Sequence, residues 1–213
     1  MTKQEAIDLI KLRLGSRDDS DLDALIVAEL QSSQEELEVT APYPWFCVSE
    51  NSLTETTAGE ARVVLPADFV AETDEARFEL STDGGVTFSK SLVKGSYDAI
   101  RAAYGDTQGE PEAYALIGNR FILGPVPDGV YKIRMIYQGR DVALSALTAG
   151  GTNQWLTIVP QYLVNMAGMA VASWVKDTNA LQVFSTFFEK ARTSYVALCT
   201  EREEANRMRQ QEA

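Results

Sequence analysis

The chain has 213 residues, enough for one large domain or two small ones, and folding would bury about 70% of the surface that the unfolded chain exposes. Its composition, 45% hydrophobic and 23% charged, is that of a soluble globular protein. A net charge of −12 argues against a protein that grips nucleic-acid phosphates, and the absence of histidine excludes Ser-His-Asp catalysis and histidine-ligated metal sites.

The N-terminal segment is predicted to be helical. Thr2 and Glu5 have the spacing of a capping box, and apolar residues follow at helical intervals, at Ile7, Ile10 and Leu14. This segment contains no hydrophobic signal core, so nothing in it suggests secretion. The longest apolar stretch, residues 162–175, is interrupted by polar residues and is shorter than a membrane span requires.

A second helix is predicted to start at Ser20. Asp21 and Asp23 would lie at the positive end of its dipole. Asp19, Asp21 and Asp23 also imitate the opening of a calcium loop, but Ala24 replaces the turn glycine and Leu30 replaces the bidentate glutamate. The sequence therefore favours a helix start and predicts no metal site.

Residues 45–147 change to a period of two, which predicts strands. Residues 78–81 lead into a hairpin turn at Asp83, Gly84 and Gly85, with residues 86–88 as the returning strand. A short helix is expected at 96–104. Further on, Gly118 and Asn119 suit a tight hairpin, and residues 130–137 alternate apolar and basic side chains.

Helical spacing returns after residue 151. Pro160 suits a first helical turn, and an apolar face ending at Trp174 follows. The next helix is expected to begin near Asn179. Its apolar residues recur at alternating steps of three and four, which predicts a packing seam of Leu181, Phe184, Phe188, Ala191, Tyr195 and Leu198.

These elements predict an α+β protein. The N- and C-terminal helix pairs, in residues 1–42 and 148–213, are expected to form a four-helix bundle. Residues 43–147 are expected to form a small inserted antiparallel β domain, the whole being one structural unit. Trp45 and Phe46 are expected to fill the junction between the bundle and the sheet.

The sequence offers little for chemistry. It has no phosphate-binding glycine loop, so no nucleotide cofactor is expected. Cys47 and Cys199 lack metal-type spacing and are interpreted as buried thiols in a reducing compartment. Glu110 and Glu112 flank Pro111 and could form a glycosidase pair, but neither has an apolar context that would raise its pKa. We therefore expect no catalytic residues and no cofactor.

Several segments, in order along the chain, resemble the phage head-to-tail adaptor (head–tail connector) family of short-tailed and related tailed phages. The segments that carry the resemblance are Pro44-Trp45-Phe46, Leu65-Pro66-Ala67-Asp68-Phe69, residues 109–137 and residues 153–177. The resemblance implies a structural virion protein, assembled in the host cytoplasm, that forms a dodecameric ring below the portal and carries the DNA channel to the tail. It implies a portal protein and a tail or nozzle protein as partners, DNA that passes without specific binding, and no membrane.

Two partner sites are hypothesised. Residues 200–213 have high helix propensity but no apolar face, so this tail should fray in the free chain and could dock on the portal through Arg202, Arg207, Met208 and Arg209. A solvated helix end without function is the alternative. The turn at Asp83, Gly84 and Gly85 could face the tail, because exposed hairpin tips often contact partners.

Other functions remain open from the sequence. One alternative is a histidine-free polysaccharide hydrolase of the tail, and another is a tail-tube or tail-completion protein. The acidic charge suits a channel that DNA traverses without sticking, but it equally suits plain solubility.

Overall fold

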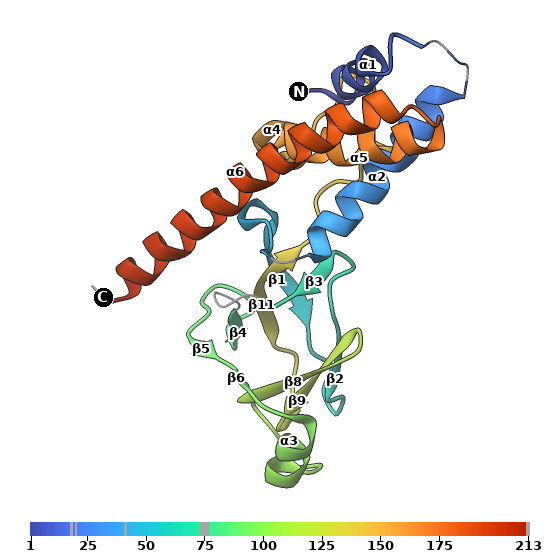
Figure 1. The fold of residues 1–213 in the computed structure, drawn as a ribbon. Helices are drawn as coiled ribbons and strands as arrows, with labels where there is room; N and C mark the ends of the chain where they lie inside the picture. The colour runs from blue at the N-terminus through green and yellow to red at the C-terminus, as the bar shows by residue number, and fades with distance from the viewer. Residues whose placement is uncertain (18, 20, 41, 73–76, 212–213) are drawn as a thin grey trace. The chain divides into compact units, whose positions relative to one another are not determined.

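The computed structural model describes residues 1–17, 19, 21–40, 42–72 and 77–211; the side chains of residues 51–53, 77, 203 and 205–211 lie outside that description. Residue contacts divide the chain into two compact units, Met1–Cys47 with Arg140–Ala213 and Val48–Gly139. We call them the helical unit and the β unit, and Figure 1 labels most of their helices and strands. The predicted α+β class is confirmed.

The unit boundaries differ from the boundaries that the sequence predicts. The sequence places them after residues 42 and 147, whereas the compact units meet at Cys47/Val48 and Gly139/Arg140. The reason is packing, because two short 3-10 helices on these connections, η1 and η2, contribute Phe46 and Leu144 to the core of the helical unit.

The helical unit consists of the helices that precede residue 48 and follow residue 139. They are α1 (Lys3–Arg13), α2 (Leu22–Val39), η1 (Trp45–Cys47), η2 (Leu144–Ala146), α4 (Gln154–Ile158), α5 (Pro160–Trp174) and α6 (Thr178–Gln211). Helix α5 contacts α1, α2, α4 and α6 and is therefore the centre of the unit. The expected start of the second helix, Ser20, lies outside the described residues.

Local sequence signals place the helix ends. The capping box at the start of α1 is confirmed: Thr2 Oγ1 accepts from Glu5 N at 3.2 Å, and Thr2 N donates to Glu5 Oε2 at 2.8 Å. Pro160 occupies the first turn of α5, as expected. Helix α6 begins at Thr178, and Asp177 Oδ1 accepts from Ala180 N at 3.0 Å at this end.

The close approach of α5 and α6 depends on a glycine. Phe184 of α6 is fully buried, and a Cβ placed on Gly168 of α5 would lie 2.3 Å from its ring. Only a residue without a side chain fits there. Tyr162 of α5 also stacks on Phe188 of α6, with ring centroids 5.2 Å apart.

The predicted seam of α6 is correct over most of its length. Phe184 and Tyr195 are buried, and Leu181, Phe188 and Ala191 are partly buried against the same core. Leu198 is an exception: it is 42% exposed, and Cys199 is buried in its place. The prediction of an apolar face that ends at Trp174 is wrong for that last residue, because Trp174 is 68% exposed.

A buried polar network fastens α2 to the chain that follows the β unit. Glu38 Oε1 accepts from Gln34 Nε2 at 2.7 Å, Asp141 N at 3.0 Å and Trp155 Nε1 at 3.2 Å. Gln34 Oε1 accepts from Leu144 N at 3.2 Å. These bonds satisfy backbone and side-chain donors that burial would otherwise leave unpaired.

In its described residues, the β unit contains short strands and a helix. They are β1 (Val48–Glu55), β2 (Arg62–Val64), β3 (Phe69–Ala71), β4 (Arg77–Ser81), β5 (Lys90–Ser91), β6 (Val93–Lys94), α3 (Tyr97–Tyr104), β7 (Gln108–Gly109), β8 (Ala113–Ile117), β9 (Arg120–Gly124), β10 (Val126–Pro127) and β11 (Lys132–Gly139). One sheet has the order β1-β11-β4-β5, with β3 also paired to β11. A second has the order β2-β9-β8-β6, and β10 pairs with β7.

Several predictions for the β unit are confirmed. Ile133, Met135 and Tyr137 are buried on one face of β11, and Gly118 turns the β8–β9 hairpin with a φ of 59°. Ser96 caps the expected helix α3.

Two expectations for the β unit are wrong. The strand that returns after β4 is β5, not residues 86–88. The unit also contains parallel pairs, β6 with β8 and β10 with β7, so it is not purely antiparallel.

Candidate functional site

No constellation for metal chemistry is present in the described part of the chain, where no group of three or more His, Cys, Asp and Glu residues could hold an ion. Of the aspartates that imitate a calcium loop, Asp21 lies at the N-cap of α2, where its side chain makes no capping hydrogen bond. Asp19 O accepts from Leu22 N at 3.0 Å, and Asp23 pairs with Lys11 at 2.9 Å.

The candidate carboxylate pair, Glu110 and Glu112, forms ion pairs with Lys90. Glu110 Oε1 lies 2.9 Å from Lys90 Nζ, and Glu112 Oε1 lies 3.6 Å from the same atom. Both carboxylates are exposed. A general acid must be free to meet a substrate, whereas both of these carboxylates are paired with Lys90.

Cys47 and Cys199 are both buried thiols in the helical unit, as predicted. Burial raises the pKa of the Cys47 thiol, and the nearby carboxylates of Asp141 and Glu38 raise it further. A thiol with a raised pKa is a poor nucleophile, so Cys47 is a structural residue.

The loop after β4 has a fixed internal structure centred on Asp83. Its carboxylate accepts from Ser81 Oγ at 2.6 Å, Thr87 Oγ1 at 2.6 Å, Thr87 N at 2.9 Å and Val86 N at 3.0 Å. These bonds hold the pKa of Asp83 well below its usual value. Gly84 follows at a φ of 77°, and Val86 is exposed.

The C-terminal part of α6 extends away from the other helices of its unit (Figure 1). The sequence predicts fraying after residue 200, but the helix continues to Gln211, consistent with a segment rich in helix formers. The guanidinium of Arg202 lies over the ring of Trp45, 5.0 Å from its centroid. Arg207, Met208 and Arg209 lie on the helix, and their side chains are outside the described part of the structure.

Trp45 and Phe46 pack within the helical unit. Trp45 stacks on Tyr195 with centroids 6.1 Å apart, and Phe46 meets Trp155 edge-on at 5.0 Å. With Arg202, they tie the projecting part of α6 to the connection that precedes the β unit.

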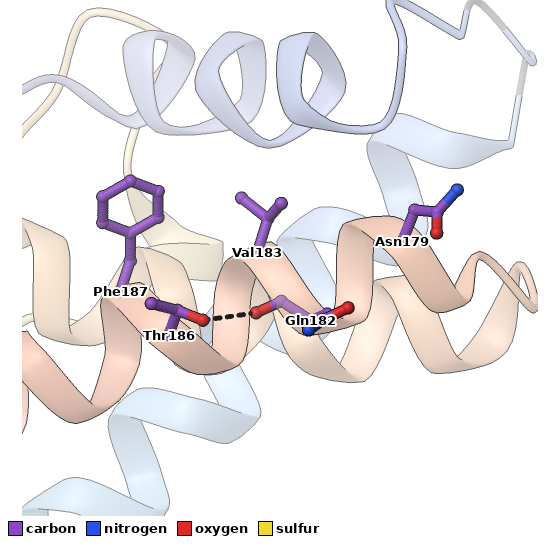
Figure 2. A pocket seen from close by; sticks show the side chains of 5 residues that line it. All are labelled: Asn179, Gln182, Val183, Thr186 and Phe187. Atoms are coloured by element: carbon purple, nitrogen blue, oxygen red, sulfur yellow. Dashed lines mark hydrogen bonds between the residues drawn. The ribbon is translucent and has the colours of Figure 1, made fainter.

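A second feature of α6 is an open groove of about 430 Å³, lined by Asn179, Gln182, Val183, Thr186 and Phe187. Their spacing places them along one stripe of the helix. Figure 2 shows Asn179, Val183 and Phe187 on the side of α6 that faces α1. The guanidinium of Arg13, in α1, lies 4.8 Å from the centroid of the Phe187 ring. We call these five residues the α6 groove.

Sequence reasoning did not find the α6 groove or the exposed Trp174. A helical period identifies apolar faces, but it does not show which face a neighbouring helix leaves uncovered. The contact between Arg13 and Phe187 joins residues far apart in the chain, and no local signal predicts it.

Within the described part of the chain, no helix has the length and apolar character needed to cross a membrane. A family model described as "SU10 adaptor protein" matches residues 1–211. No curated protein matches the chain.

Proposed function

Because the chain belongs to the SU10 adaptor protein family, a family of phage head-to-tail adaptors, we propose that it forms a ring below the portal and continues the DNA channel to the tail. A phage adaptor is a structural component of the virion and associates with other virion proteins such as portal and tail. The match over residues 1–211 is the observation that carries this proposal.

The helical unit is proposed to meet the portal. Helices α1, α2, α5 and α6 would act as one four-helix bundle, since α5 contacts each of the others. The projecting part of α6 would be the docking arm, with Arg202, Arg207 and Arg209 pairing with portal carboxylates and Met208 filling a small pocket. Because Arg202 already lies over Trp45, the base of this arm is held in place before docking.

The β unit is proposed to meet the tail or nozzle protein through the loop of Asp83, Gly84 and Gly85. The hydrogen bonds of Asp83 support this role, because they order the loop without a partner and so lower the entropic cost of binding. The exposed side chain of Val86 gives the loop an apolar surface for a partner to cover.

The ring is proposed to be dodecameric, like the portal above it, and to be assembled in the host cytoplasm. The net charge of −12 supports a channel through which DNA passes without specific binding. Neither a tail hydrolase nor a tail-tube protein is favoured by an observation, and the ion-paired, exposed Glu110 and Glu112 argue against the former.

Co-sedimentation with purified cognate portal rings tests the function. The full chain should pellet with the rings and should appear below the portal in negative-stain images. A chain that remains in the supernatant at every concentration would contradict the proposal, and release of sugars by the isolated monomer would favour the hydrolase.

A chain truncated after Thr200 tests the docking arm. It should still unfold cooperatively, with less helical signal because part of α6 is missing, and it should lose portal binding, since it lacks Arg202, Arg207, Met208 and Arg209. The matched control is Lys190→Gln with Arg192→Gln, which removes exposed cations from α6 upstream of the arm and should bind as the full chain does. Unchanged binding after truncation would show that the arm has no docking role.

A further inference from the structure

Trp174 is an exposed aromatic side chain with a fixed position. It is 68% exposed at the end of α5, and its indole Nε1 donates to Glu29 Oε1 of α2 at 2.9 Å. Tryptophan is enriched among the residues that dominate the energy of protein–protein interfaces. An indole held by a hydrogen bond loses little freedom when a partner covers it.

The α6 groove is a second uncovered apolar surface of the same unit. Val183 and Phe187 are 43% and 45% exposed, and polar side chains from Asn179, Gln182 and Thr186 border them. A stripe with this spacing on a helix is the kind of surface that packs against another element. The α6 groove therefore offers two exposed apolar side chains, with polar neighbours, to another element.

The two surfaces carry opposite charges. Glu29 lies beside Trp174, and among the described residues no cation pairs with it. Arg13 lies over Phe187 and donates to Asn165 Oδ1, and within the same described part no carboxylate pairs with it. An aromatic ring with a carboxylate thus complements an apolar groove with a guanidinium.

The two surfaces also belong to different sides of the helical unit. Trp174 contacts α2, whereas the α6 groove lies on the side of α6 that faces α1 (Figure 2). A contact between two different patches is heterologous, and repeated heterologous contacts close into rings when the rotation permits. A contact between these two surfaces from one copy to the next would be of this heterologous kind.

We propose that Trp174 and Glu29 of one copy dock on the α6 groove and Arg13 of the next copy. The proposal names the contact between subunits and rests on the proposed ring. In it the indole covers Val183 and Phe187, and the Glu29 carboxylate pairs with the Arg13 guanidinium.

Disulfide trapping between single-cysteine variants tests the contact. Ser173→Cys lies beside Trp174, and Gln182→Cys lies in the α6 groove; both positions are exposed. Mixed in equal amounts and mildly oxidised, free and on portal rings, the two variants should give a cross-linked dimer joined between positions 173 and 182. Each variant alone should stay monomeric on a non-reducing gel, as should the wild type with its buried thiols.

The control mixture is Ser173→Cys with Ser194→Cys, because Ser194 is exposed on α6 outside the groove. An equal yield of dimer from this mixture, or no dimer from the first mixture in either condition, would overturn the proposal. Portal binding without a trapped dimer would refute this contact and leave the adaptor function standing. A trapped dimer without portal binding would support this contact between copies and contradict the adaptor function.

Trp174→Ala gives an independent measurement. The substitution removes an exposed side chain, so the melting temperature should stay near that of the wild type, while association between copies should weaken at least about tenfold. Val196→Ala, at another exposed position of α6, should leave association unchanged. If Trp174→Ala spares association but weakens portal binding, the portal is the occupant and our proposal is wrong.

Discussion

At the scale of single residues, Glu38 combines burial with charge. Among the described residues it is the one carboxylate-bearing side chain that is almost fully buried, at 1% exposure. Burial raises the pKa of Glu38, hydrogen bonds from Gln34, Asp141 and Trp155 oppose that effect, and the Asp141 carboxylate adds to it. The hydrogen bonds keep the side chain in place, but its ionised form carries a cost in stability.

Glu38→Gln is expected to flatten the pH dependence of stability. The native protein takes up a proton on Glu38 at a higher pH than the unfolded chain does, because the folded pKa is raised above the ordinary 4.5. The stability contributed by this proton is therefore fully present below pH 4.5 and is lost as the pH rises through the folded pKa. Urea unfolding from neutral pH down to 4.5 should show the wild type gaining stability relative to the variant.

The matched control is Glu36→Gln, an exposed position on the same helix, whose pH profile should follow the wild type. Asp83 does not interfere with this measurement. Its pKa is lowered below 3.8, so the stability that it contributes is lost only at a pH below the measured range. Parallel profiles for the wild type and Glu38→Gln would show that Glu38 has the same pKa in the folded and unfolded chain.

At the scale of elements, the contact between α5 and α6 depends on Gly168. Gly168→Ala should gain up to about 1 kcal/mol in helix propensity. It should lose more, about 1–3 kcal/mol, because the new methyl group enters the space of the buried Phe184 ring. We expect a net loss in the free energy of unfolding, measured by urea denaturation.

Phe184→Leu supplies the second arm of a double-mutant cycle. The smaller side chain opens space for the methyl group, so Gly168→Ala should cost less in the Phe184→Leu background than in the wild type. Equal costs in the two backgrounds would contradict a direct clash between these positions.

The elements also show how far local patterns determine the fold. The alternation that buries Ile133 and Met135 and the capping box at Thr2 depend on near neighbours, and both were predictable. Pairing between distant strands is not a local property, so the parallel alignment of β6 with β8 was missed. Near the end of the seam, the buried position shifts by one residue, from Leu198 to Cys199, and a regular spacing of three and four residues does not predict that shift.

The candidate surfaces also divide into features set by near neighbours in the sequence and features set by distant contacts. The turn of Asp83, Gly84 and Gly85 was predictable from its composition, although its network of hydrogen bonds was not. The α6 groove depends on where α1 ends relative to α6, and only the folded helical unit provides that information.

At the scale of the whole molecule, the charge predicts weak interaction with DNA. The full chain should show no measurable affinity for duplex DNA at near-physiological salt, because its 31 acidic residues outnumber its 19 basic ones and repel the phosphates. Fluorescence anisotropy with a labelled duplex measures this, and a repeat at low salt serves as the control. Tight, salt-sensitive binding would contradict a channel that DNA traverses freely.

The first and last strands of the β unit, β1 and β11, are paired with each other. Val48, its first residue, pairs with Gln138, its penultimate one, across β1 and β11. An inserted unit whose two ends lie close together behaves as a cassette. Its length or sequence can change while the distance between the two points where it joins the helical unit stays the same. Changes in the length or sequence of this cassette can therefore leave the helical unit unchanged.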